Sequence, residues 1–149
     1  MNILRNILAV VVGALIGGTV NMAIIIASPQ IIPLPEGINP GDMQSLVDNI
    51  HLFKPINFLM PFLAHALGTL VGAILAGVIA ASHKMYFSLA IGGFFLLGGV
   101  SMAMDVDAPL WYDIVDIVLA YIPMGYLGYL IALKIGGDGK APKPEVLDL

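Results

Sequence analysis

Four long stretches of this chain contain no Asp, Glu, Lys or Arg, and this distribution of charge constrains the fold more than any other feature. The stretches cover residues 6–35, 55–83, 85–104 and 117–133. A helix of about 20 mostly apolar residues crosses the ~30 Å hydrocarbon core of a bilayer. We therefore expect an all-α integral membrane protein, a four-helix up-down bundle with spans at about 3–27, 58–81, 86–104 and 111–133.

The composition agrees with a lipid environment. Hydrophobic residues make up 59% of the chain and charged residues 11%, whereas a soluble domain carries about 25% charged residues. Nearly the whole length is needed for four spans, which predicts one transmembrane domain over residues 1–135. Residues 136–149 are polar and contain Gly and Pro, so a flexible cytoplasmic tail is expected there. The first apolar run, 7–27, is longer than the about 7–15 residues of a signal-peptide core and is expected to be a span.

Charge and cysteine content exclude several classes of function. The net charge is −4 and the six Lys and Arg are scattered, so no nucleic acid is expected among the partners. The chain has no cysteine, which excludes disulfides, thiol catalysis and thiolate metal sites. The expected partners are membrane lipids, and a homo-oligomer or a partner membrane protein remains open.

The basic residues predict the orientation of the spans. Lys54 falls on one side of the expected bundle, and every other basic residue falls on the opposite side: Arg5, Lys84, Lys134, Lys140 and Lys143. Basic residues favour the cytoplasmic side of a membrane. We therefore expect a multi-pass protein of the cell membrane, a prokaryotic inner membrane, with both termini cytoplasmic. The outer side is then acidic, with Glu36, Asp42, Asp48, Asp105, Asp107, Asp113 and Asp116.

Prolines and polar residues predict where the helices start, end and bend. Pro29 is expected to end the first span, and Pro123 predicts a kink near residues 119–123. The external loop, 28–57, contains a helix start at Asn39 and Pro40. Apolar residues follow at helical spacing: Met43, Leu46, Val47 and Ile50. They predict a short external amphipathic helix, either on the membrane surface or on top of the bundle.

Small residues recur at helical spacing on the spans. On the fourth span, Tyr121 begins a face that continues with Gly125, Gly128 and Ala132, while Asp113, Asp116, Ala120 and Met124 lie on the roughly opposite face. Small residues let helices in lipid approach closely. The two faces therefore indicate one of two arrangements. Both pack within a single bundle, or one packs against the bundle and the other against a second copy of the chain.

Polar residues from three spans converge on the outer leaflet. The candidate ligand-binding residues are His65, Asp116, Asn21, Asp113, Thr69 and Ser101. Such groups at membrane depth usually face an interior and find a partner. One interpretation is a His65–Asp116 hydrogen-bonded pair that fixes helix register. The other is a site for Zn²⁺, Mn²⁺ or Fe²⁺ formed by His65, Asp116, Asp113 and Asp105.

No motif in the chain specifies a reaction or a cofactor. We favour a non-enzymatic membrane protein that binds a small ligand, a lipid or a partner protein through an outward-facing polar pocket. The alternatives are a metal-dependent membrane enzyme acting at the outer leaflet and a small carrier or channel. A proton path is disfavoured because the inner halves of the spans carry almost no titratable groups.

Overall fold

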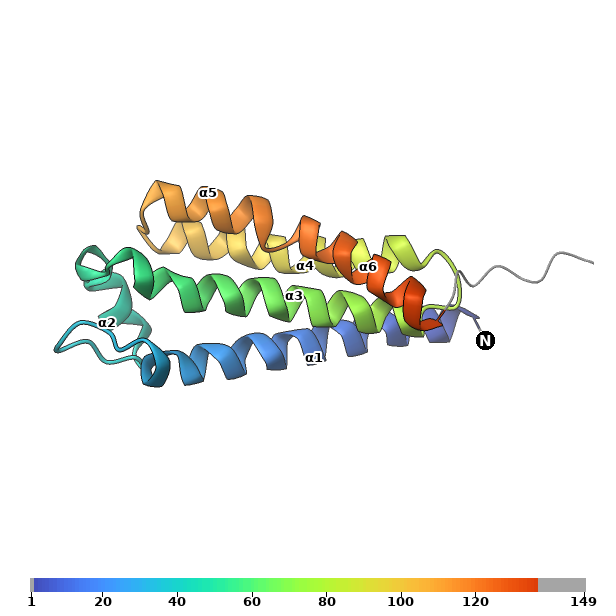
Figure 1. The fold of residues 1–149 in the computed structure, drawn as a ribbon, viewed down its shortest axis with the longest axis horizontal. Helices are drawn as coiled ribbons and strands as arrows, with labels where there is room; N and C mark the ends of the chain where they lie inside the picture. The colour runs from blue at the N-terminus through green and yellow to red at the C-terminus, as the bar shows by residue number, and fades with distance from the viewer. Residues whose placement is uncertain (1, 137–149) are drawn as a thin grey trace, which may run out of the picture.

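The computed structural model describes residues 2–136, and all regular elements in that range are helical. They are α1 (Asn2–Ile31), α2 (Met43–Asp48), the 3-10 turns η1 (Ile50–Leu52) and η2 (Pro55–Phe58), α3 (Leu59–Ile79), α4 (Lys84–Asp105), α5 (Leu110–Leu119) and α6 (Ile122–Gly136). In Figure 1 the long helices lie side by side along the long axis, and α2 lies at the end away from the N-terminus. The all-α class is confirmed.

Four helical stretches are long and apolar enough to cross a membrane. They are Asn2–Ile31, Pro55–Ile79, Lys84–Asp105 and Leu110–Gly136, and each overlaps an expected span closely. The last stretch combines α5 and α6. Residues 137–149, which hold most of the expected tail, lie outside the described residues.

The first helix is longer than the sequence predicts. Pro29 lies inside α1, which continues to Ile31, so the expectation that Pro29 ends this helix is wrong. A proline removes one N–H donor, here the one that would bond the carbonyl of Ile25. The helix tolerates this loss near its end, because the N–H of Ile32 donates to the Ser28 carbonyl at 2.9 Å and closes the last turn.

Glycines bring α1 and α3 into close backbone contact. A Cβ built on Gly13 would lie 2.7 Å from the carbonyl oxygen of Gly72, and one built on Gly17 would lie 2.6 Å from that of Gly68. Neither helix could carry a side chain at these positions without moving apart. These small residues therefore pack within the chain, as close approach between helices requires.

The fourth stretch breaks between α5 and α6, so the predicted kink near 119–123 is confirmed. The N–H of Ala120 donates to the Asp116 carbonyl at 2.9 Å, and the N–H of Gly125 donates to the Tyr121 carbonyl at 2.8 Å. Between them Pro123 has no N–H to donate and sits in the first turn of α6, a position that proline suits.

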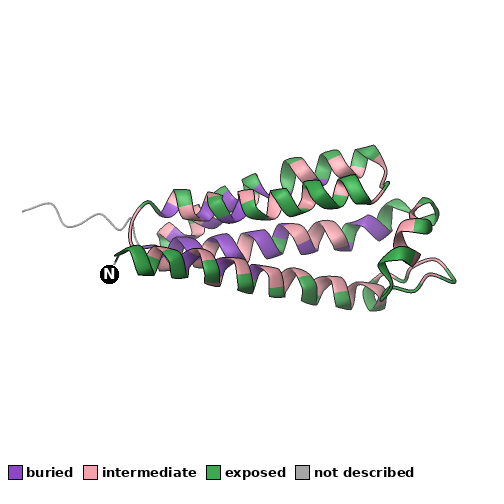
Figure 2. Ribbon diagram, turned by 180° about the vertical axis from the view of Figure 1, so that it is seen from behind, coloured by how far each residue is buried: buried purple, intermediate pink, exposed green. Residues whose placement is uncertain are grey.

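The two ends of the molecule differ in packing. Near the N-terminus, Asn6 accepts the N–H of Ala81 at 2.9 Å, and the Lys84 ammonium donates to the Gly136 carbonyl at 3.2 Å. Figure 2 shows most buried residues along α3 and toward this end, whereas the opposite end is largely intermediate or exposed. The tightly packed end leaves the opposite end as the place for a cavity.

Candidate functional site

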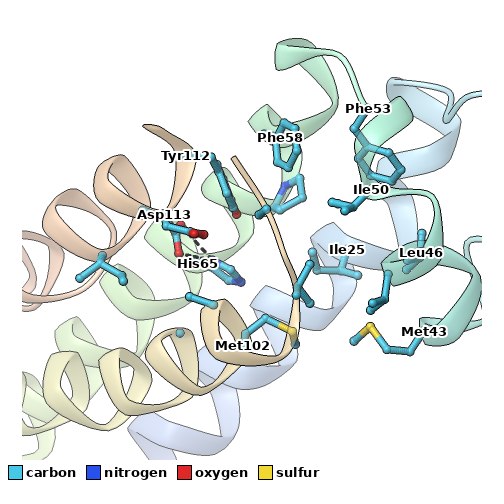
Figure 3. A pocket seen from close by; sticks show the side chains of 18 of the residues that line it. Ile25, Met43, Leu46, Ile50, Phe53, Phe58, His65, Met102, Tyr112 and Asp113 are labelled. Carbon is cyan, nitrogen blue, oxygen red and sulfur yellow. Dashed lines mark hydrogen bonds and ion pairs between the residues drawn. The ribbon is translucent and has the colours of Figure 1, made fainter. Parts of the chain in front are cut away.

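A cavity of about 300 Å³ lies at the end away from the N-terminus. Every helix except α6 contributes to its wall, together with the segment that follows α2. Figure 3 shows Tyr112, Asp113 and His65 gathered on one side, with the apolar side chains of Met43, Leu46, Ile50 and Phe53 opposite. The cavity thus has a polar corner and a broad apolar wall.

The predicted amphipathic helix forms part of this wall. Its N-cap is Asp42, whose side chain accepts the N–H of Gln44 at 3.0 Å. The expected cap, Asn39, instead accepts the N–H of Gly41 at 3.0 Å and forms the preceding turn, so that assignment is wrong. All four predicted apolar residues, Met43, Leu46, Val47 and Ile50, line the cavity, so this segment covers the end of the helices.

Aromatic rings hold one side of the cavity in place. The buried ring of Phe58 lies 4.8 Å from the ring of Tyr112, 5.7 Å from that of Trp111 and 5.8 Å from that of Phe53, measured between centroids. Phe58, Tyr112 and Phe53 also line the cavity. Contacts of this kind add about 0.5–1.5 kcal/mol per pair beyond burial, which favours a preformed wall.

His65, Asp116 and Tyr121 form a hydrogen-bonded group at the polar corner. The Nδ1 atom of His65 lies 2.9 Å from both carboxylate oxygens of Asp116, and the Tyr121 hydroxyl donates to Asp116 Oδ2 at 2.7 Å. The same hydroxyl lies 3.0 Å from His65 Nδ1. Asp116 is 4% exposed and Tyr121 is 1% exposed, so the carboxylate is desolvated and satisfied by protein donors.

This geometry assigns the proton of the imidazole. Nδ1 faces a carboxylate and is therefore assigned a hydrogen, so that Nε2 is the acceptor nitrogen when the ring is neutral. In Figure 3 the distal nitrogen of His65 points away from the dashed contacts and toward the apolar wall. A carboxylate behind an imidazole fixes its orientation and strengthens the distal nitrogen as a hydrogen-bond acceptor or ligand.

The other candidate residues divide into two groups. Asn21 and Asp113 line the cavity with His65 and Asp116. The buried Oδ1 of Asn21 has no hydrogen-bond partner among residues 2–136.

Thr69 and Ser101 lie away from this corner. Thr69 is fully buried outside the cavity wall, and its hydroxyl has no partner within the described range. Ser101 is on an exposed part of α4, and Asp105 is exposed at the end of that helix. Neither lines the cavity. In the described part of the chain, no three His, Asp or Glu side chains are grouped so as to hold a metal ion.

Sequence reasoning missed Tyr121 as a member of the site. On an unbroken helix, residues five apart point about 140° away from each other, so Asp116 and Tyr121 were expected on opposite faces. The break before α6 reorients Tyr121 and brings its hydroxyl to the carboxylate. Pro123 was the available signal, because a kink there changes which side chains share a face.

Comparison with models of protein families, with curated proteins and with solved structures finds no match for this chain. The chemistry of the site therefore rests on its geometry alone. That geometry offers a preformed apolar cavity with several hydrogen-bond acceptors at one corner, the usual form of a small-molecule site.

Proposed function

We propose that this chain is a four-span membrane protein whose outward-facing cavity binds a small amphiphilic ligand. In this proposal the helices cross the membrane as an up-down bundle with both termini in the cytoplasm. His65 and Asp116 anchor the polar part of the ligand, and Asn21 and Asp113 assist. The observation that carries the proposal is the cavity of about 300 Å³, with its apolar wall and convergent polar corner.

The outer surface of the helices supports a lipid environment. Large apolar side chains are exposed along the long helices, among them Leu97 at 73% and Leu15 and Ile26 at 66%. A water-soluble monomer rarely exposes contiguous apolar surface of this extent. Lipid contact accounts for these residues, and the distribution of basic residues supports the orientation.

A purely structural pair accounts for only part of the site. Register between α3 and α5 is fixed by the contacts of His65 Nδ1 with Asp116. That role requires neither an unpartnered Asn21 oxygen nor a cavity beside the pair. A ligand that occupies the cavity would lie against these polar residues and exclude water from them.

Trp111 provides a direct test, because it is the only tryptophan and packs edge-on against Phe58. Three dodecyl probes that share a brominated chain, with trimethylammonium, hydroxyl or sulfate heads, would be added to the protein in zwitterionic nanodiscs. We expect at least one probe to quench Trp111 saturably in the wild type. Ala103→Phe, which fills the cavity wall, should abolish that quenching, and Leu97→Phe on the exposed face of the same helix should preserve it.

The absence of saturable quenching by any probe would overturn the proposal. Equal quenching in the Ala103→Phe variant would also overturn it, because the probe would then be acting from the lipid. Far-ultraviolet circular dichroism and gel filtration of each variant establish that it remains folded.

The metal-dependent enzyme has one supporting observation, the carboxylate behind His65. Histidines that bind a metal through one nitrogen commonly donate the other N–H to a carboxylate. Elemental analysis of the purified wild type beside Asp116→Asn tests this alternative. Stoichiometric transition metal that is lost in the variant would favour the enzyme, and protein free of metal would count against it.

A further inference from the structure

Several side chains that line the cavity offer hydrogen-bond acceptors, and these favour particular head groups. Asp113 lines the wall with a carboxylate, and Nε2 of His65 is an acceptor whenever the ring is neutral. Asn21 also lines the wall, and its buried carbonyl oxygen has no hydrogen-bond partner among residues 2–136. A ligand that satisfies these atoms must donate hydrogen bonds or carry positive charge. A head group made only of acceptors would leave them unpaired.

The charged side chains around the cavity are mainly acidic. No Lys or Arg of residues 2–136 lines it, whereas Asp113 and Asp116 do. The same end of the molecule carries further exposed acids, namely Glu36, Asp42, Asp48, Asp105 and Asp107, against the exposed Lys54. Such a surface attracts cations and repels anionic head groups such as phosphate or sulfate.

The aromatic side of the cavity suits a cation as well. The rings of Phe58 and Tyr112 lie 4.8 Å apart between centroids and line the wall beside Asp113. A cation is attracted to the face of an aromatic ring, most strongly where water is excluded. Aromatic rings with a nearby carboxylate are a recurring way to hold an alkylated ammonium.

Two methionines of the cavity wall are also exposed on the outside of the helices. Met22 on α1 and Met102 on α4 line the cavity and are 55% and 41% exposed. Met22 is about 13 Å of helix rise from the end of α1 at Ile31, so in a membrane its exposed face would meet lipid. Methionine adapts to irregular apolar ligands, and an alkyl chain could extend between these residues into the bilayer.

We infer that the ligand of this cavity is a cationic amphiphile. Its ammonium-type head lies beside the His65–Asp116 pair, against Asp113, Asn21 and the ring of Tyr112, and its apolar chain leaves past Met22 and Met102. This inference rests on the proposed function and specifies the class of molecule bound. The acidic surface disfavours anionic amphiphiles, and a neutral head group leaves the negative charge of Asp113 uncompensated.

The three brominated dodecyl probes separate the two proposals in the wild type alone. We expect dodecyltrimethylammonium to quench Trp111 at a concentration at least about tenfold lower than the alcohol, and the sulfate to give no saturable quenching. Saturable quenching by the alcohol or the sulfate at equal or lower concentration would overturn the cationic assignment and leave the amphiphile pocket standing. No quenching by any probe would overturn both proposals.

Two pairs of variants locate the head group. Asp113→Asn should weaken binding of the cation about tenfold. This loss lies between the small effect of removing an exposed ion pair and the large effect of breaking a buried one. Asp107→Asn removes the same charge from an exposed site at the same end of the molecule. It should change the affinity for the cation by less than about twofold. Equal effects of the two would show that only the general field matters and would refute the placement beside Asp113.

The second pair tests the aromatic contact. Tyr112→Phe keeps the ring and should keep the affinity for the cation, while Tyr112→Leu should weaken it several-fold and leave binding of the alcohol unchanged. If both variants lose affinity for the cation, the Tyr112 hydroxyl and not the ring makes the contact. If both keep that affinity, the ring does not contact the head group.

Discussion

Two adjacent glycines of α1 have opposite surroundings, and replacing each by alanine tests the packing of this helix. A Cβ on Gly17 would lie 2.6 Å from the Gly68 carbonyl oxygen, 3.0 Å from a ring carbon of Phe95 and 3.1 Å from the Gly72 Cα. A Cβ on Gly18 would meet no atom within 4 Å. The two substitutions add the same methyl group one residue apart, so they differ only in what that group contacts.

The expected magnitude follows from two opposing effects. Alanine stabilises a helix relative to glycine by about 0.5–1 kcal/mol, and this effect is common to both variants. Overpacking costs about 1–3 kcal/mol, and it applies to Gly17→Ala because two of its three contacts are backbone atoms that cannot rotate away. The free energies of unfolding should therefore differ by about 1–3 kcal/mol, or about 5–150-fold in the equilibrium constant, with Gly17→Ala the less stable.

Reversible unfolding in mixed micelles, followed by the fluorescence of Trp111, measures this difference. Gly18→Ala should be as stable as the wild type or slightly more stable. If the two variants are equally stable, or if Gly17→Ala is the more stable, α1 does not pack on α3 through Gly17 and the arrangement of these helices is wrong.

Other variants test the polar corner. His65→Ala and Asp116→Ala should each lower the free energy of unfolding by about 1–3 kcal/mol, and the double variant should lose about 0.5–3 kcal/mol less than their sum; additive losses would show that the two side chains do not interact. Gly99→Ala should destabilise the protein by about 1–3 kcal/mol, because its Cβ would overlap the Tyr121 hydroxyl. Gly98→Ala, with no atom within 4 Å, should be as stable as the wild type or up to about 1 kcal/mol more stable; similar thermal unfolding of these two would contradict the position of Tyr121.

The long apolar helices could be predicted from the sequence because one physical requirement determines them. A backbone in lipid must satisfy its own hydrogen bonds, so charge-free stretches of sufficient length become helices. The same reasoning located Asn21, His65, Asp113 and Asp116 at one end, and the structure brings them to one cavity. Depth along a helix can be counted from sequence, because the rise per residue is constant.

Details could not be predicted in this way where neighbouring residues allow more than one local structure. Asn39 and Asp42 are both good N-caps, and only the path of the loop selects Asp42. Pro29 can end a helix or lie in its last turn, and the hydrogen bond from Ile32 decides between these. Tyr121 reaches Asp116 because of the angle of the break before α6, which a proline indicates but does not specify.

Labelling of single cysteines in intact cells tests the central claim, a cavity that opens outward from a four-span membrane protein. The chain has no cysteine of its own, so Ser82→Cys, in the α3–α4 turn, and Asp107→Cys, beside the cavity end, can be labelled without background. A membrane-impermeant maleimide should modify Asp107→Cys from outside and Ser82→Cys only after the membrane is permeabilised. Modification of both from the same side, or the reverse pattern, would contradict this orientation and the outward opening of the cavity.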